Sequence, residues 1–338
     1  MTVLENLNVL ISENIKKAQQ EAVFLQEIYS NPSLPVGKNE FLFFIKPEIT
    51  LESDTIQLNR ILEFIQDKIL SFGFKIHQVR ILSAKYLEQY NIIAQHYGII
   101  NRISTNAVQN MSDSAKEKFV KIYGKSVKEV EVLGGSEFLE KYSVFNAASL
   151  EYLWQNFENN KLAGGTYSEV IKMDQEPVYL LNGFHPMQLK HFTGKGRSIV
   201  VMTLSGAISW KDARNNFIGA TDPGRANQGS LRRGLLDRKD EFGLAEVSQG
   251  VNGVHLSAGP VEALIELRRF SSDFSVKNGE KDFLDFTFGK RLLEIFNGNI
   301  DPIIENSNVL VSGKATSIFD LTEEQDSDEA ICLLKKYV

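Results

Sequence analysis

One histidine lies in a segment whose neighbours could support phosphoryl transfer. His255 follows Asn252 and precedes Ser257 and the dipeptide Gly259-Pro260. Proline is favoured at the first position of a helix, so Pro260 predicts a helix start. His255 then lies close to the positive end of a helix dipole, where anions are stabilised. A neutral imidazole in such a place can act as a nucleophile, although a lone histidine is more often a surface or satisfied core residue.

A carboxylate further along the chain could orient this imidazole. Glu266 follows His255 by about three helical turns, if the intervening segment were helical throughout. Its carboxylate can reach the ring only if the loop after His255 folds back onto the helix. It would then hold one ring nitrogen and leave the other available as the nucleophile.

Hydrogen-bond donors suited to phosphate are concentrated upstream of the histidine. Arg214 is followed by two glycine-containing segments, Gly219–Pro223 and Gly229–Gly234, which supply a threonine and two arginines. Guanidinium groups, a hydroxyl and glycine-rich backbone can together hold a polyphosphate. A single arginine is more often a solvated surface charge, but three such elements in one stretch favour a phosphate site.

Alternating strands and helices are expected to position these residues. The apolar run Phe41–Ile45, together with residues 75–83 and 197–204, predicts strands. Helices are expected from a stripe at residues 58–69, from Ser209 as an N-cap to Phe217, and from Pro260 to Phe270. We expect an α+β fold, an antiparallel sheet with helices on one face.

The remaining segments are expected to form additions to this core. Residues 1–38 predict an N-terminal helical extension that ends in a turn-rich break at Asn31–Gly37. Residues 101–176 lack clear strand alternation, so we expect a mostly helical insertion. Residues 296–338 form a C-terminal extension with an acidic stretch.

Composition limits the class of protein. The chain has 338 residues with 43 acidic and 37 basic side chains, a formal net charge of −6. This balance gives no general affinity for nucleic acid or anionic membranes, so neither is an expected partner. No apolar run approaches the length of a membrane span. The single cysteine, Cys332, excludes an internal disulfide, and we expect a cytoplasmic protein.

Six short motifs resemble those of the nucleoside diphosphate kinases. The motifs occur in the same order as in the family. Phe44–Pro47 is similar to the family's Val-Lys-Pro motif, His96-Tyr97 to its His-Tyr pair, and Phe184–Pro186 to its Phe-Phe-Pro motif. Gly219–Pro223 is similar to its Gly-x-Thr-Asn-Pro segment, Gly229–Arg232 to its Gly-Thr-Ile/Leu-Arg segment, and Asn252–Ser257 to its Asn-x-x-His-x-Ser signature. The resemblance implies a ferredoxin-like catalytic domain formed by residues 39–100 and 177–295.

The same resemblance implies a role for each matching residue. His255 would carry the phosphoryl group, and Glu266 and Ser257 would orient it. The other implied residues contact the nucleotide: Lys46, Tyr97 and Asn252 around the transferred phosphoryl group, Arg214, Thr221 and Arg232 on the outer phosphates, and Phe184 stacked on the base.

The implied reaction is a ping-pong transfer through phosphohistidine. The γ-phosphate of ATP or another nucleoside triphosphate would pass through His255 to a nucleoside diphosphate. Mg²⁺ would be the cofactor, bound to the phosphates with no protein ligands. The family also implies a homo-oligomer, at least a dimer.

Several departures from the family leave alternatives open. A long insertion separates Tyr97 from Phe184, Leu256 replaces the usual glycine after the histidine, and Ala258 replaces the usual aspartate. One alternative is a specialised kinase whose insertion selects a non-standard acceptor. The other is a nucleotide-binding regulatory or scaffold protein.

Overall fold

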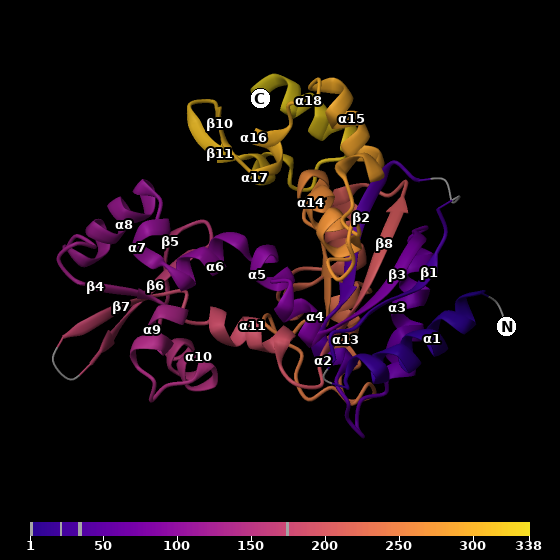
Figure 1. Ribbon diagram of the computed structural model, residues 1–338, viewed down its shortest axis with the longest axis horizontal. Coiled ribbons are helices and arrows are strands. Elements are labelled where there is room, and N and C mark those ends of the chain that lie inside the picture. The colour runs from indigo at the N-terminus through magenta and orange to yellow at the C-terminus, as the bar shows by residue number, and fades with distance from the viewer. Residues whose placement is uncertain (1–2, 21, 33–35, 174–175) are drawn as a thin grey trace. The chain divides into compact units, whose positions relative to one another are not determined.

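The chain divides into two units, each with its own sheet. The computed structural model describes residues 3–20, 22–32, 36–173 and 176–338. Unit 1 comprises Met1–Tyr90 and Lys195–Val338, and unit 2 comprises Asn91–Gly194. The mixed content of helices and antiparallel strands is that of an α+β protein (Figure 1).

A five-stranded sheet forms the centre of unit 1. Its order is β1-β3-β8-β2-β9, and every neighbouring pair is antiparallel. The strands are β1 (Leu25–Ser30), β2 (Asn39–Ile45), β3 (Lys75–Ser83), β8 (Ser198–Gly206) and β9 (Val254–Leu256). The predicted strands over 41–45, 75–83 and 197–204 are therefore confirmed, each within a few residues.

Helices cover both faces of this sheet, whereas the sequence led us to expect them on one face. On one face, Ile45 and Met202 meet α1 (Val3–Ala18) and α3 (Leu58–Ser71). On the other face, Phe44 packs on Phe270 of α14 (Pro260–Ser271) (Figure 1). The reason lies in β2 itself, since Phe41–Ile45 is apolar at every position and must be shielded from water on both sides.

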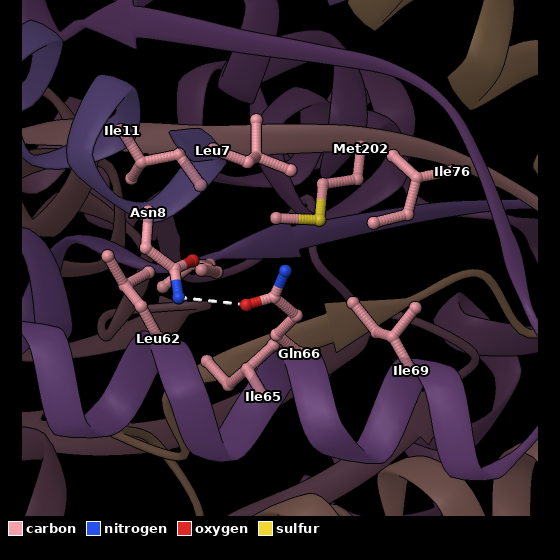
Figure 2. Close-up of a pocket in the computed structure, with 10 residues that line it drawn as sticks. Leu7, Asn8, Ile11, Leu62, Ile65, Gln66, Ile69, Ile76 and Met202 are labelled. Carbon is pink, nitrogen blue, oxygen red and sulfur yellow. Dashed lines mark hydrogen bonds between the residues drawn. The ribbon is translucent and has the colours of Figure 1, made fainter. Parts of the chain in front are cut away.

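Helix α1 belongs to the body of unit 1. An apolar crevice between α1, α3 and the sheet is lined by Leu7, Ile11, Leu62, Ile65, Ile69 and Ile76 (Figure 2). Across it, Asn8 Nδ2 donates a hydrogen bond of 2.8 Å to Gln66 Oε1, which links the two helices.

The N-terminal segment is not helical throughout, in contrast to the expectation for residues 1–38. After α1 ends at Ala18, β1 pairs with β3 and extends the sheet by one strand. The pairing shifts register between Glu27 and Tyr29, and this bulge removes the strict alternation by which a strand is recognised. Of the turn-rich break predicted at Asn31–Gly37, residues 33–35 lie outside the described residues.

Unit 2 contains a sheet that the sequence did not predict. Its strands are β4 (Glu131–Gly134), β5 (Asn160–Ala163), β6 (Thr166–Lys172) and β7 (Pro177–Leu181), in the order β4-β7-β6-β5. The helices of unit 2 are α5 (Ile92–His96), α6 (Gly98–Thr105), α7 (Ala107–Asn110), α8 (Asp113–Tyr123), α9 (Gly135–Lys141), α10 (Ala147–Gln155) and α11 (His185–Thr193). Strands β4 and β5 have only four residues each, too few to give a periodic pattern, and the buried and exposed residues of the longer β6 do not alternate strictly.

The limits of unit 2 differ from the 101–176 expected for the insertion. Strand β7 pairs with β4 and β6, and α11 packs against α6 and α9. Because of these contacts, unit 2 extends to Gly194. Residues 174–175 lie outside the described residues.

The rest of unit 1 completes the surroundings of α14. Helix α15 (Thr287–Ile295) is followed by α16 (Asp301–Ile304), the hairpin β10 (Asn308–Val311) and β11 (Lys314–Ser317), α17 (Ile318–Thr322) and α18 (Ser327–Tyr337). Shorter elements are α2 (Pro47–Thr50), α4 (Ala84–Gln89), α12 (Trp210–Asp212), the π-helix Ala213–Ile218 and α13 (Leu231–Asp237). Among the described residues, the helices are all too short or too polar to cross a membrane.

Candidate active site

His255 lies on the edge strand of the unit 1 sheet. It pairs with Phe44 of β2, and the imidazole stacks on the phenyl ring with centroids 4.4 Å apart and planes 17° from parallel. The side chain is 18% exposed, so the ring is held on one side and accessible on another. Gly253, two residues earlier, has φ +79°, and an added Cβ would lie 2.5 Å from Leu235. Glycine is therefore required for the bend that starts β9.

Glu266 of α14 binds the imidazole, and Ser257 binds Glu266. Glu266 Oε2 lies 3.2 Å from His255 Nε2, and Ser257 Oγ donates to the same oxygen at 2.5 Å. The loop after His255 folds back because α14 begins at Pro260 and packs against β2, the strand next to β9. The Glu266 side chain is only 3% exposed, which strengthens its interactions with both partners.

The two arginines flank His255 through the main chain. Arg232 Nη2 donates to Val254 O at 3.1 Å, and Arg214 Nη1 donates to Leu256 O at 2.9 Å. Because β9 is the last strand of the sheet, these carbonyls have no neighbouring strand to bond. The guanidinium groups take the place of that strand, a role that sequence reasoning missed because β9 has only three residues.

Lys46 lies one residue beyond the end of β2, close enough to Arg232 for their charges to interact. Its Nζ donates to Asn252 Oδ1 at 2.7 Å. The pKa of Lys46 is lowered to about 8, mainly by burial and also by the Arg232 charge, while the Glu48 carboxylate acts in the opposite direction. Lys46 is therefore a partly desolvated cation whose charge can change close to neutral pH.

Asn252 and Thr221 connect the lysine to the upstream glycine segment. Asn252 Nδ2 donates to the main-chain oxygens of Thr221 and Gln249, at 3.1 Å each. The Thr221 side chain is exposed. Of the predicted site residues, the structure thus brings together in unit 1 His255, Glu266, Ser257, Lys46, Asn252, Arg214, Arg232 and Thr221.

Two acidic residues that the sequence analysis did not assign to the site also belong to its framework. Glu262 Oε2 accepts a hydrogen bond from Ala258 N at 3.2 Å. Burial and the Glu266 carboxylate raise the pKa of Glu262. Glu48 Oε1 accepts from Gly253 N at 2.8 Å and so holds the bend before β9. The spacing of Glu262 and Glu266, one helical turn apart, was the available signal.

Tyr97 and Phe184 belong to unit 2. The Tyr97 ring centroid lies 6.2 Å from that of His185, which is buried. Phe184 packs between Trp154 at 5.8 Å and Tyr167 at 6.1 Å. Both aromatic residues thus have packing partners within unit 2, and their parts in nucleotide binding remain predictions.

Comparison with known proteins gives similarities to solved structures alone. The chain matches no protein-family model and no curated protein. Among solved structures it is similar to an NDP kinase from Pyrobaculum aerophilum, at 18% identity and a TM-score of 0.33. The match covers 73% of this chain and 98% of the other. A similarity of this strength assigns neither a family nor an activity to the chain.

Proposed function

We propose that this protein is a nucleotide phosphotransferase of the nucleoside diphosphate kinase type, which carries the phosphoryl group on His255. One observation carries the proposal. An accessible imidazole is bound at Nε2 by a buried carboxylate that also accepts from Ser257, as an oriented nucleophile requires. Lys46, Arg214 and Arg232 supply positive charge around the same strand.

The topology of unit 1 supports the same proposal. Strands β2, β3, β8 and β9 lie in the order β3-β8-β2-β9 and are all antiparallel. Helix α3 connects the first two in sequence, and α12 and α13 lie between the last two. A ferredoxin-like β-α-β-β-α-β arrangement would have this strand order, with β1 added at an edge, and the agreement supports the proposal.

The geometry suggests which nitrogen reacts. When the imidazole proton is on Nε2, the ring donates it to Glu266, and the lone pair is on Nδ1. In the first step, this lone pair forms a bond to the γ-phosphorus as the bond to the bridging oxygen breaks, and the nucleoside diphosphate leaves. In the second step, a terminal oxygen of the acceptor diphosphate forms the new bond, and the phosphorus–nitrogen bond breaks. Glu266 stabilises the positive charge of the phosphorylated ring.

Cationic side chains would stabilise the transferring group. The charge spread over the equatorial oxygens can be neutralised by Lys46 and by guanidinium nitrogens of Arg214 and Arg232. Mg²⁺ bound to the nucleotide phosphates would add to this neutralisation. Glu48, the carboxylate next to Lys46, bonds to Gly253 N, so we assign the ion to the phosphates and to no protein ligand.

Steady-state kinetics with ATP and a second nucleoside diphosphate test the proposal. A ping-pong enzyme gives parallel double-reciprocal lines when the donor is varied at several acceptor concentrations. Intersecting lines would indicate direct transfer in a ternary complex, and no transfer to any of the common nucleoside diphosphates would contradict nucleoside diphosphate kinase activity.

A second candidate, a kinase with a non-standard acceptor, is favoured by the composition of unit 2. Asn91–Gly194 has two apolar clusters and a sheet of its own, and it contains Tyr97 and Phe184. If Tyr97 and Phe184 contact the nucleotide, as the family resemblance implies, this unit could select the acceptor. This candidate requires that ATP label His255 while the common nucleoside diphosphates fail to discharge it.

A further inference from the structure

The turn that joins β9 to α14 is held by its main chain on both sides. Ala258 lies in this turn, directly after Ser257. Its N–H donates to Glu262 Oε2 at 3.2 Å, and its carbonyl accepts from Glu324 N at 3.0 Å. Glu262 belongs to α14, whereas Glu324 lies between α17 and α18 near the C-terminus. The C-terminal segment therefore contacts the residue beside Ser257.

The next residue, Gly259, leaves no room between the turn and this segment. A Cβ added to Gly259 would lie 2.6 Å from Thr322 O and 3.0 Å from Glu323 Cα. The φ of Gly259 is −162°, an extended conformation that any residue adopts. Glycine is thus needed here only because the C-terminal segment approaches so closely.

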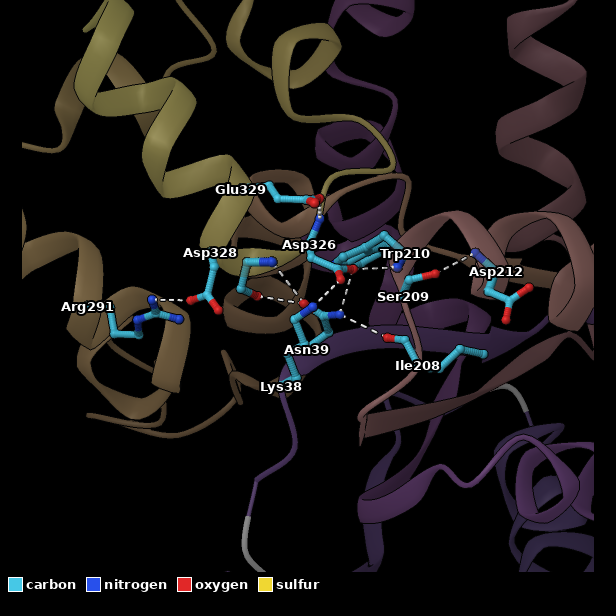
Figure 3. A network of polar contacts seen from close by, with 11 residues as sticks. Lys38, Asn39, Ile208, Ser209, Trp210, Asp212, Arg291, Asp326, Asp328 and Glu329 are labelled. Carbon is cyan, nitrogen blue, oxygen red and sulfur yellow. Dashed lines mark hydrogen bonds and ion pairs between the residues drawn. The ribbon is translucent and has the colours of Figure 1, made fainter.

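The segment itself is fixed to unit 1 by a buried polar network (Figure 3). Asp326 Oδ1 accepts from Trp210 N at 2.8 Å and from Asn39 Nδ2 at 3.0 Å, while Oδ2 bonds to Lys38. Ser327 N and Oγ both donate to Asn39 Oδ1 at 2.9 Å. Because Asn39 begins β2, the strand next to His255, this network ties the segment to the same sheet.

Electrostatics adds a second connection between the segment and the site. Glu262 lies beside Glu266, whose oxygen binds both His255 and Ser257. The Glu323 carboxylate acts on Glu262 from the C-terminal side. Contacts thus run without interruption from Asp326 through residues 322–324 to the turn, and from the turn to the imidazole.

We propose that residues 322–326 are a positioning element for the His255 site, with Gly259 as the contact point and Asp326 as the anchor. By holding the Ala258–Gly259 turn, they fix Ser257 and the start of α14, and so the place of Glu266 against the imidazole. The effect of this element on the reaction rests on the proposed function of His255. Its effect on the orientation of the imidazole ring does not depend on that function.

Two variants test the positioning element, one at its contact point and one at its anchor. Gly259→Ala forces the turn and the segment apart, and Asp326→Ala removes the anchor without touching the site. The matched controls are Gly164→Ala, where an added Cβ meets nothing within 4 Å, and Asp328→Ala, which breaks the exposed ion pair with Arg291 but leaves the hydrogen bonds of Asp326 in place (Figure 3).

Each full-length variant is examined by long-range ¹H–¹⁵N correlation spectra of the histidines and by the rate of labelling with γ-labelled ATP. We expect Gly259→Ala and Asp326→Ala to shift the His255 ring nitrogens and its titration midpoint, and to slow labelling by about 10–100-fold. The controls should leave both measurements within twofold of the wild type. Circular dichroism establishes that each variant is folded.

The spectra decide the claim even if the phosphotransfer proposal fails. A wild type that ATP does not label would contradict the proposed function, while shifted His255 nitrogens in the variants would still support the positioning element. Unshifted nitrogens in folded Asp326→Ala would overturn it. So would ring nitrogens shifted equally by Asp328→Ala.

Discussion

At the scale of single residues, the site is defined by what holds one imidazole. Phe44 supports its face, Glu266 binds Nε2, and Ser257 shares the same carboxylate oxygen. The residue types and their order were evident from the sequence. The distances were not, because they depend on how α14 packs against β2.

The charge of Glu266 should matter more than its shape. In Glu266→Gln the amide can still bond to the imidazole but no longer stabilises its positive charge, so we expect phosphorylation of His255 to slow by about 10²-fold or more. Quenched-flow labelling with γ-labelled ATP measures this rate. The control is Glu280→Gln, whose side chain is 61% exposed. An unchanged rate in Glu266→Gln would remove Glu266 from the mechanism.

The depressed pKa of Lys46 gives a pH dependence with a defined sign. Below about 8 the free protein carries a charged Lys46 that attracts phosphate, and above that value the charge and the attraction are lost. The kcat/KM for the donor nucleotide should therefore fall as pH rises through about 8. In Lys46→Met, kcat/KM should be low and should lack this alkaline decline, whereas exposed Lys335→Met should retain the wild-type profile. An alkaline decline that persists in Lys46→Met belongs to another group.

At the scale of elements, two arginines bind the outer edge of β9. Strand β9 presents the carbonyls of Val254 and Leu256 outward, where Arg232 and Arg214 bind them. Arg232 also donates to Gly219 O at 2.9 Å, so it connects β9 to the upstream glycine segment. This guanidinium group thus has a structural part in addition to the proposed phosphate contact.

Removing that guanidinium should destabilise the fold, and the adjacent arginine provides the control. A hydrogen bond to a charged group contributes about 1.5–3 kcal/mol, so Arg232→Ala should lower the free energy of unfolding by at least that amount. Arg233, whose partner is the partly exposed Asp237, should contribute about 0–1 kcal/mol. Urea unfolding measures both values. Equal losses would show that the β9 edge does not depend on Arg232.

Long helices and strands could be predicted from the sequence, whereas the short or irregular strands could not. The apolar stripe of α3, the continuous apolar run in β2 and the proline at the start of α14 each have one physical explanation, and each predicted its element. Strand β1 has a bulge, β9 has three residues, and β4 and β5 have four, so periodicity could not reveal them. Their stability comes from tertiary pairing, which a local pattern does not record.

At the scale of the whole molecule, two cores are built from one chain. The unit 2 residues are consecutive, whereas unit 1 is assembled from the segments before and after them. Helix α1, strand β1 and the C-terminal helices all join unit 1, so the extensions complete this unit. A segment near the C-terminus contacts the turn beside the site, whereas α1 packs against α3, β1, β3 and β8.

Assembly should bury helical faces and not extend the sheet. One edge strand, β1, has a bulge, and the other, β9, has its outward carbonyls bound by arginines, so neither presents a regular edge. From the family resemblance we expect at least a dimer, and light scattering should give no less than twice the chain mass. A monomer at working concentration would contradict this expectation.

The most direct test of the account is the chemical identity of the phosphorylated residue. The protein is incubated with γ-labelled ATP and Mg²⁺, the label is tested for stability in acid and base, and the modified peptide is sequenced by mass spectrometry. The account predicts an acid-labile, base-stable phosphoryl group on Nδ1 of His255, discharged by an acceptor nucleotide and absent from folded His255→Gln. A label on any other residue, or one retained in His255→Gln, would contradict the account.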